Sequence, residues 1–259
     1  MTDPWNPDQY AKFAREREQP FFDLMAMLRP ARAMRVVDLG CGTGKLTRLL
    51  HAQLQAQDTL GIDRSPRMLE RHDAEPLPSG LRFEMRDIEA FPAGGEQFDV
   101  VFSNAALQWV DDHDALIPRL ATAVAPGGQM AVQVPAMHDD ASHTVADALI
   151  QEEPFRSAAQ GWRRSQPVLR PEEYARLLFD NGFADPAVRL IVYPHVLPAT
   201  DDVVEWMKGT LLAEYSRHLP AALFGRFLDE YRQRLTTSIG TARPYFFPFK
   251  RILMWGHRA

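Results

Sequence analysis

The chain has 259 residues, of which 46% are hydrophobic and 24% charged, and its formal net charge is −5 at pH 7. This length and apolar content suffice for one α/β core with an elaboration. The acidic balance argues against a nucleic-acid groove, which needs a basic face. No segment approaches the roughly 18 apolar residues of a membrane helix, and no secretory signal is recognisable. Cys41, the single cysteine, excludes an intrachain disulfide and favours a cytoplasmic location.

In chain order, the first predicted element is a helix over residues 8–28. Apolar runs then predict strands at about 34–39, 59–63, 81–86, 98–103 and 129–134, separated by helical segments and with a turn at 125–128 before the fifth. A helix follows from Pro171 to Asn181, and Gly182 ends it. A sixth strand begins at Leu190, and residues 246–255 form the last. We therefore expect an α/β fold with a seven-stranded, mostly parallel, Rossmann-like sheet and helices on both faces.

A glycine-rich turn directly follows the first strand. It contains Asp38, Gly40, Gly42 and Gly44, and it opens onto a helical pattern. A dinucleotide-binding turn needs a third glycine at the position of Lys45 or Thr47. A phosphate loop needs glycine at the position of Leu39 and Ser or Thr at the position of Leu46, so neither motif is present. The remaining pattern, Asp-x-Gly-x-Gly-x-Gly, resembles class I S-adenosylmethionine methyltransferases. A plain tight turn is the alternative, and Cys41 within it is best interpreted as a small filler rather than a nucleophile.

Polar residues end the next three strands. Asp63 suits a ribose diol, whose hydroxyls donate to a carboxylate, and Ser65 and Pro66 already supply the cap and start of the next helix. Asp87 is suited to an adenine amino group, with Ile88 packing on the ring. Parallel strands bring such residues to one edge of the sheet. The predicted cofactor site comprises Asp38, Gly40, Gly42, Gly44, Asp63, Arg64, Met68, Asp87, Ile88, Asn104 and Gln108.

The rest of the chain is expected to elaborate one domain over residues 1–259. Two helical patterns, Asp201 to Arg217 and Ala221 to Leu235, lie between the last two strands. An insertion of this length predicts a helical lid over the substrate, formed by about 136–170 and 198–243. A packing or dimerisation element is the alternative, so a monomer or a homodimer is expected.

Several longer motifs make the resemblance more specific. Together they are similar to the trans-aconitate methyltransferase family; they are Trp5-Asn6-Pro7, Phe13-Ala14-Arg15-Glu16-Arg17, Asn104-Ala105-Ala106-Leu107-Gln108-Trp109, Ala131-Val132-Gln133-Val134-Pro135 and Val204-Glu205-Trp206-Met207-Lys208-Gly209-Thr210. The resemblance implies S-adenosylmethionine (SAM) as methyl donor, S-adenosylhomocysteine as product and methyl esterification of a small organic acid. It also implies that Tyr10 and Arg17 lie over the cofactor.

The departures from the family pattern concern the substrate. An expected arginine is replaced within Leu211-Leu212-Ala213-Glu214, an Asp-Asn pair by Ala136-Met137, and a Phe-Pro-Arg segment by residues 247–251. A tricarboxylate needs several cationic partners, so the acceptor is expected to be a less charged, more apolar acid. Arg217, Arg243 or Arg251 could compensate.

A carboxylate acceptor is ionised at neutral pH and needs no general base, so catalysis would depend on alignment and exclusion of water. A phenol or amine acceptor would need a base, and the candidates are His113, His138, His143 and His195. His143 and His195 match histidines that recur in the resembled family. The predicted substrate-side residues are Trp109, His143, Tyr193 and Trp206.

Two alternatives stay open. His138, Asp139 and His143 have the spacing of possible metal ligands, but a charged helix start is favoured and no metal is expected. A SAM-binding sensor or regulatory subunit would keep the same cofactor residues and lack a working acceptor site. The expected partner is a small carboxylic acid, with neither nucleic acid nor membrane involved.

Overall fold

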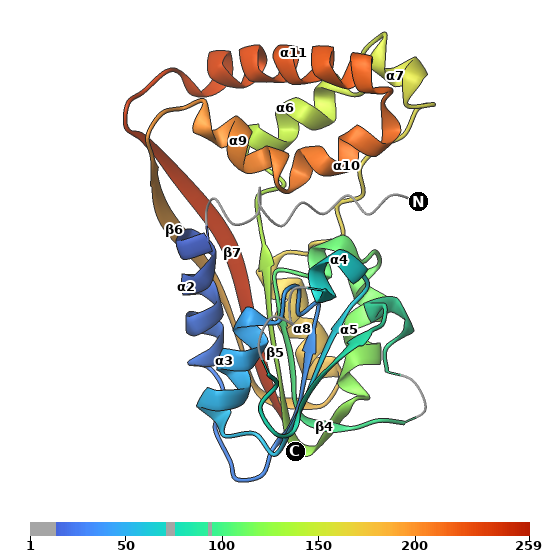
Figure 1. Cartoon of the computed structure of the whole chain (residues 1–259), viewed down its shortest axis with the longest axis vertical. Coiled ribbons are helices and arrows are strands. Elements are labelled where there is room, and N and C mark those ends of the chain that lie inside the picture. Colours follow the sequence, from blue (N-terminus) through green and yellow to red (C-terminus); the bar gives the residue numbers. More distant parts are fainter. Residues whose placement is uncertain (1–13, 71–75, 93–94) are drawn as a thin grey trace. The chain divides into compact units, whose positions relative to one another are not determined.

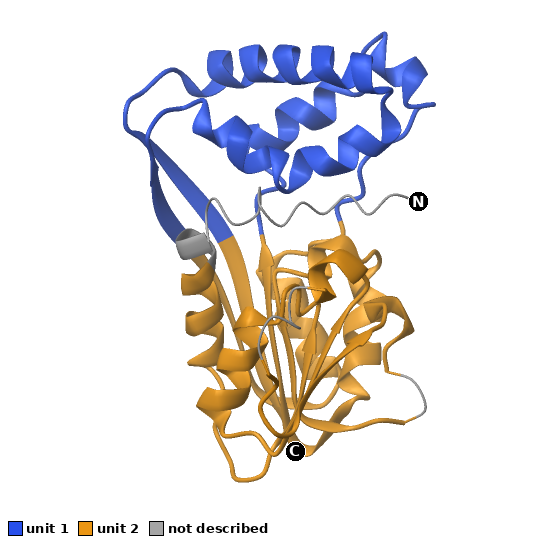
Figure 2. Cartoon of the chain, in the orientation of Figure 1, with its two compact units in different colours: residues 1–16, 136–166, 192–250 blue, residues 17–135, 167–191, 251–259 orange. Residues whose placement is uncertain are grey.

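The computed structural model describes residues 14–70, 76–92 and 95–259. The chain forms two compact units (Figure 2). Unit 1 comprises residues 1–16, 136–166 and 192–250, and unit 2 comprises residues 17–135, 167–191 and 251–259. The expectation of one domain over the whole chain stays a prediction. No helix among the described residues has both the length and the apolar character needed to cross a membrane.

The sheet has seven strands in the order β3-β2-β1-β4-β5-β7-β6. Their bounds are β1 Arg35–Leu39, β2 Asp58–Asp63, β3 Leu81–Met85, β4 Phe98–Asn104, β5 Val124–Pro135, β6 Phe183–Leu197 and β7 Tyr245–Arg258. The pairs among β1 to β5 are parallel, and β7 is antiparallel to β5. This confirms the predicted mostly parallel sheet. Because the chain passes from β3 at one edge to β4 on the other side of β1, strand order reverses between β1 and β4, which is where such sheets bind ligands.

Helices cover both faces of the sheet in unit 2 (Figure 1). They are α2 Ala14–Met25, α3 Lys45–Leu54, α4 Pro66–Leu69, α5 His113–Ala121 and α8 Pro171–Asp180, with 3-10 turns η2 Ile88–Ala90 and η3 Leu107–Trp109. Phe21 and Leu24 of α2 pack with Leu50 of α3 against Val36 and Phe102 of the sheet, and all five side chains are buried. This apolar layer fixes α2 and α3 on one face.

Unit 1 is mainly helical. Its helices are α6 Ala141–Leu149, α7 Phe155–Ala158, α9 Asp202–Lys208, α10 Leu211–His218 and α11 Ala221–Ile239. They share a core that includes the buried Trp206, Tyr215, Phe227 and Tyr231. The Tyr231 hydroxyl donates to the carbonyl oxygen of Ser142 at 2.8 Å, which joins α11 to α6. The proposed role of these segments as a cover for the substrate stays a prediction.

Four predicted boundaries were wrong. The helix expected over 201–217 is divided into α9 and α10 at Gly209, which has low helix propensity and is the C-cap of α9. Residues 125–128, expected to form a turn before the fifth strand, lie within β5. The register between β4 and β5 shifts across them, from Phe98 paired with Val124 to Val100 paired with Gln129. β6 begins at Phe183, seven residues before the expected start, and Asp185, Pro186 and Arg189 in the added part interrupt the apolar pattern. The first helix ends at Met25, before the expected residue 28.

Candidate functional site

The glycine turn between β1 and α3 is held by close packing. Gly40, Gly42 and Gly44 have backbone φ angles of +76°, +57° and +74°, in a region that residues other than glycine rarely adopt. A Cβ on Gly40 would lie 2.2 Å from the Cβ of Ala106, and one on Gly44 would lie 2.5 Å from the Phe83 ring. The amides of Gly40 and Cys41 donate to the carbonyl oxygen of Ile62 at 2.8 and 2.9 Å. The turn is therefore packed against the ends of β2 and β4, with α3 beginning directly after it.

Asp38 is a buried carboxyl beside this turn. It is 4% exposed, and its Oδ2 accepts a hydrogen bond of 2.6 Å from the Thr47 hydroxyl. Burial raises the pKa of Asp38 to about 7, with the Thr47 hydrogen bond opposing the rise and the charge of Asp63 adding to it. A cationic ligand here would favour the ionised carboxylate.

Asp63 joins the turn to the segment after β2. Its Oδ2 accepts from the Gly42 amide and its Oδ1 from the Ser65 amide, both at 2.9 Å. Ser65 caps α4, as predicted, by accepting from the Met68 amide at 3.2 Å. Asp63 therefore has a structural role in addition to any contact with a ligand, because both of its oxygens bind backbone amides. Contact of this carboxylate with a ligand hydroxyl stays a prediction.

The neighbouring predicted residues differ in exposure. Arg64 is exposed, whereas Met68 and Ile88 are each 8% exposed. Asp87 is half-buried, and its Oδ1 accepts from the Glu89 amide at 3.0 Å, which starts η2. The Ile88 side chain reaches within 3.6 Å of where a Gly40 Cβ would stand. Ile88 is thus adjacent to the glycine turn, and its contact with adenine stays a prediction.

Two amide oxygens at the end of β4 have buried, unused hydrogen-bonding capacity. Asn104 Oδ1 and Gln108 Oε1 have no hydrogen-bond partner among the described residues. The Gln108 Nε2 donates to the Ala105 carbonyl oxygen at 2.8 Å, which fixes the orientation of the amide. A buried acceptor without a donor costs about 1–3 kcal/mol. A ligand with N–H or O–H groups would remove that cost.

The remaining predicted cofactor residues lie partly outside the described structure. Tyr10 lies outside the described residues, and for Arg17 only the backbone, within α2, is described. Trp109 ends η3 and is half-buried. Roles for these three side chains stay predictions.

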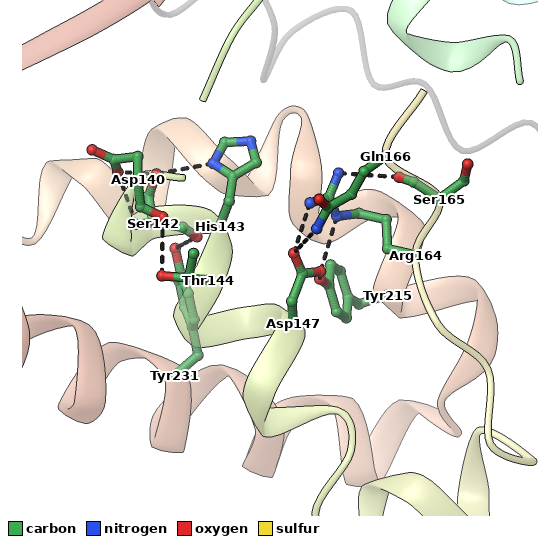
Figure 3. A network of polar contacts seen from close by, with 10 residues as sticks. All are labelled: Asp140, Ser142, His143, Thr144, Asp147, Arg164, Ser165, Gln166, Tyr215 and Tyr231. Atoms are coloured by element: carbon green, nitrogen blue, oxygen red, sulfur yellow. Dashed lines mark hydrogen bonds and ion pairs between the residues drawn. The ribbon is translucent and has the colours of Figure 1, made fainter. Parts of the chain in front are cut away.

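His143 lies on α6 in unit 1, beside a polar network (Figure 3). The Ser142 hydroxyl donates to Asp140 at 2.6 Å and lies 3.1 Å from His143 Nδ1. The Ser142 hydroxyl has one hydrogen, which it donates to Asp140, so toward His143 its oxygen can only accept. His143 Nδ1 therefore carries the proton and donates to Ser142. Burial, aided by the positive charge of Arg164 and opposed by Asp147, lowers the pKa of His143 to about 3. His143 is therefore neutral near pH 7.

Asp147 is the centre of the same network. It accepts from Arg164 Nε and Nη2 at 3.0 and 2.7 Å, from Gln166 Nε2 at 3.1 Å and from the Tyr215 hydroxyl (Figure 3). Burial alone would raise the pKa of Asp147, but the hydrogen bonds from Arg164 and Tyr215 lower it. These bonds tie the segment at 164–166 to α6 and α10. The Arg164 guanidinium therefore forms an ion pair with a carboxylate of the same unit.

The other predicted substrate residues lie in the interior of unit 1. Trp206 is 1% exposed, and its ring stacks on His195 with a centroid distance of 5.0 Å. Phe249 packs on both rings. Tyr193 and His195 are 6% and 7% exposed. This burial favours a packing role for Trp206, and contact of these residues with an acceptor stays a prediction. Among the described residues, no group of three or more potential ligands could hold a metal ion.

Comparison with known proteins agrees with this geometry. Residues 36–128, from β1 into β5, match the model of a methyltransferase domain family. The trans-aconitate 2-methyltransferase of Deinococcus radiodurans is 42% identical over 255 residues, which cover 96% of each chain. This chain belongs to the trans-aconitate methyltransferase family. Membership confirms the expected enzyme class, a SAM-dependent methyltransferase.

Solved structures that resemble the family member described here confirm its fold. The YcgJ protein of Bacillus subtilis superimposes with a TM-score of 0.60 at 16% identity, covering 93% of this chain and 98% of that one. The phosphoethanolamine N-methyltransferase 2 of Haemonchus contortus, in complex with SAM, gives a TM-score of 0.54 at 15% identity, covering 93% and 52%. At these identities the likeness concerns the fold alone.

The buried residues of this methyltransferase fit the SAM that its family uses. The acceptors Asn104 Oδ1 and Gln108 Oε1 suit donors of the cofactor, and Asp38 suits its cationic end. Sequence reasoning missed two polar residues near this edge. Thr47 binds Asp38, and Gln133, which is fully buried in β5, accepts from Arg251. A glutamine within an apolar strand was the available signal for Gln133.

Proposed function

We propose that this chain transfers the methyl group of SAM to a carboxylate oxygen of a small organic acid, which yields a methyl ester and S-adenosylhomocysteine. The observation that carries the proposal is the 42% identity, over 96% of both chains, to a protein named trans-aconitate 2-methyltransferase. The buried acceptors at the end of β4 support the cofactor half of this assignment. The family name supports an acid as acceptor.

Residues of unit 2 would hold the cofactor. Asp63, whose oxygens accept from the Gly42 and Ser65 amides, would also accept from the ribose hydroxyls. Asn104 Oδ1 and the carboxylate of Asp38 would accept from the ammonium end, and Asp87 with Ile88 would receive the adenine. SAM supplies an electrophilic methyl group on a sulfonium. The protein would hold the bound cofactor in line with the acceptor oxygen and would exclude water from the site.

Two of the four His candidates, His143 and His113, do not suit the role of general base, which favours a carboxylate acceptor. A general base works best when its pKa is near the operating pH, and the pKa of His143 is about 3. His113 is 1% exposed, and its Nε2 forms a hydrogen bond of 2.9 Å with the Leu107 carbonyl oxygen, so its role is structural. A carboxylate needs no deprotonation at neutral pH. We therefore favour an acid over a phenol or an amine.

The test uses the purified chain with methyl-labelled SAM. Acceptors are trans-aconitate, citrate, succinate, benzoate, a phenol and an amine. We expect labelled product with at least one acid, and release of the label in mild base because the product is an ester. Transfer only to the phenol or amine contradicts the ester assignment. SAM binding without transfer to any acceptor would favour a sensor or regulatory subunit.

The molecular setting is also part of the proposal. The net charge of −5 and the single cysteine support a cytoplasmic protein that acts on a small molecule without nucleic acid or membrane. We propose a monomer or homodimer. Light scattering of the purified chain distinguishes these states, and a higher oligomer would contradict both.

A further inference from the structure

Three adjacent strands of unit 2 carry polar side chains in a row. Asn104 of β4 is paired with Gln133 of β5, and Gln133 is paired with Leu253 of β7. Arg251 precedes Leu253 by two residues, so it has the same facing as Leu253. The Arg251 Nη1 donates to Gln133 Oε1 at 3.2 Å. These residues therefore form a polar row where β4 and β5 end.

Gln133 has a donor group that is not used. It is fully buried, and its Nε2 has no hydrogen-bond partner among the described residues. Because Oε1 accepts from Arg251, the amide is oriented and Nε2 faces away from that bond. A buried N–H without an acceptor costs about 1–3 kcal/mol. The site is therefore complete only with an additional acceptor atom.

Arg251 adds a positive charge at the same place. Its side chain is 3% exposed, and a guanidinium stays charged when buried. Guanidinium and amide N–H groups together form a donor set suited to carboxylate oxygens. Asn104 Oδ1, on the next strand, is an acceptor and suits the cofactor instead. The row thus presents donors on β5 and β7 and an acceptor on β4.

We propose that Arg251 and the Gln133 amide bind a carboxylate of the methyl acceptor. This inference rests on the proposed function, and it assigns the residues that select an acid. One guanidinium and one amide suffice for one carboxylate, which agrees with an acid of low charge.

The experiment measures acid binding directly, without turnover. Trans-aconitate, citrate, succinate and benzoate are titrated by calorimetry into the S-adenosylhomocysteine complex of the wild type, Arg251→Gln and Gln133→Glu. We expect each substitution to weaken binding of the acid about 10- to 100-fold, the range for losing hydrogen bonds to a charged group. Gln133→Glu is nearly isosteric and should pair with Arg251, so it removes the site while keeping the packing.

Arg258→Gln is the matched control on the same strand. Arg258 donates to the Ala121 and Val124 carbonyl oxygens, so its loss affects the fold and not the acid. Affinity for S-adenosylhomocysteine should stay within about twofold of wild type in Arg251→Gln and Gln133→Glu. If Gln133→Glu is folded and binds acid like the wild type, the proposal is wrong. It is also wrong if cofactor and acid affinities fall in parallel, or if the wild type binds none of the four acids.

Turnover separates this proposal from the proposed function. A wild type that binds an acid but never methylates it refutes ester formation, while the loss of binding in Gln133→Glu still supports the carboxylate site. Conversely, methylation of an acid with unchanged KM in both variants supports the function and overturns the role of Arg251 and Gln133.

Discussion

Asp63 Oδ2 accepts the Gly42 amide at 2.9 Å, so the acid after β2 holds the glycine turn after β1. The same carboxylate accepts the Ser65 amide through Oδ1. One side chain therefore fixes two loops at the edge where the cofactor is proposed to bind. The same carboxylate therefore has a structural role beside its proposed contact with the cofactor.

Replacing Asp63 with alanine should consequently lower both SAM affinity and stability. We expect about 1–3 kcal/mol of lost binding free energy, since buried hydrogen-bonding groups are left unpaired. Calorimetry with SAM and thermal unfolding of the free protein measure the two effects. Unchanged SAM affinity would remove Asp63 from the cofactor site.

Asp38 should make SAM binding depend on pH. Its folded pKa is about 7, raised from 3.8 by burial, so the carboxyl is protonated below pH 7 and a cationic ligand must displace the proton. Affinity should rise about tenfold between pH 6 and pH 8 relative to Asp38→Asn, in which this dependence is absent. Equal pH dependence in both proteins contradicts the contact.

The stability of the free protein should change in the opposite direction. Because the pKa of Asp38 is raised on folding, the unfolded chain holds fewer protons than the folded one between about pH 4 and 7. The Asp38 contribution therefore becomes less favourable as pH rises through this window. Urea unfolding of wild type and Asp38→Asn at pH 5 and pH 8 measures it.

Asn104→Leu should separate ligand binding from folding. The amide oxygen is buried and has no donor among the residues that the structure describes, so its removal should not lower the free energy of unfolding. SAM binding should weaken by about 1–2 kcal/mol because a hydrogen-bond acceptor is lost. A variant with wild-type SAM affinity would exclude Asn104 from the site.

The glycine turn offers a matched pair of substitutions. Gly42→Ala adds a Cβ that has no atom of the described residues within 4 Å apart from its chain neighbours, so its cost comes from the positive φ alone. Gly44→Ala adds a Cβ 2.5 Å from the Phe83 ring as well as the same backbone strain. We expect Gly44→Ala to lose about 1–3 kcal/mol more stability. Equal losses in denaturant unfolding would show that Phe83 moves aside freely.

His143 should not control the pH dependence of turnover. Burial lowers its pKa to about 3, so its protonation state is constant from pH 5 to 9. His143→Gln should keep the shape of the pH–rate profile for the acid substrate. Loss of an inflection near pH 6.5 in this variant would indicate a general base and revive the phenol or amine assignment.

The sequence alone predicted the mostly parallel sheet and the polar residues at the edge where its strands end. Asp38, Asp63, Asp87 and Asn104 each follow an apolar run, and parallel pairing brings strand ends together. Short-range patterns of this kind depend on neighbouring residues, so they are readable without coordinates. The family motifs could be read for the same reason.

Only the tertiary structure decided how the side chains are used. Both oxygens of Asp63 bind backbone amides, which depends on the packing of two loops. The bond between Gln133 and Arg251 joins residues 118 positions apart. The low pKa of His143 depends on burial within unit 1 and on the charge of Arg164. Partners and burial of this kind are fixed by long-range packing, which local sequence patterns do not encode.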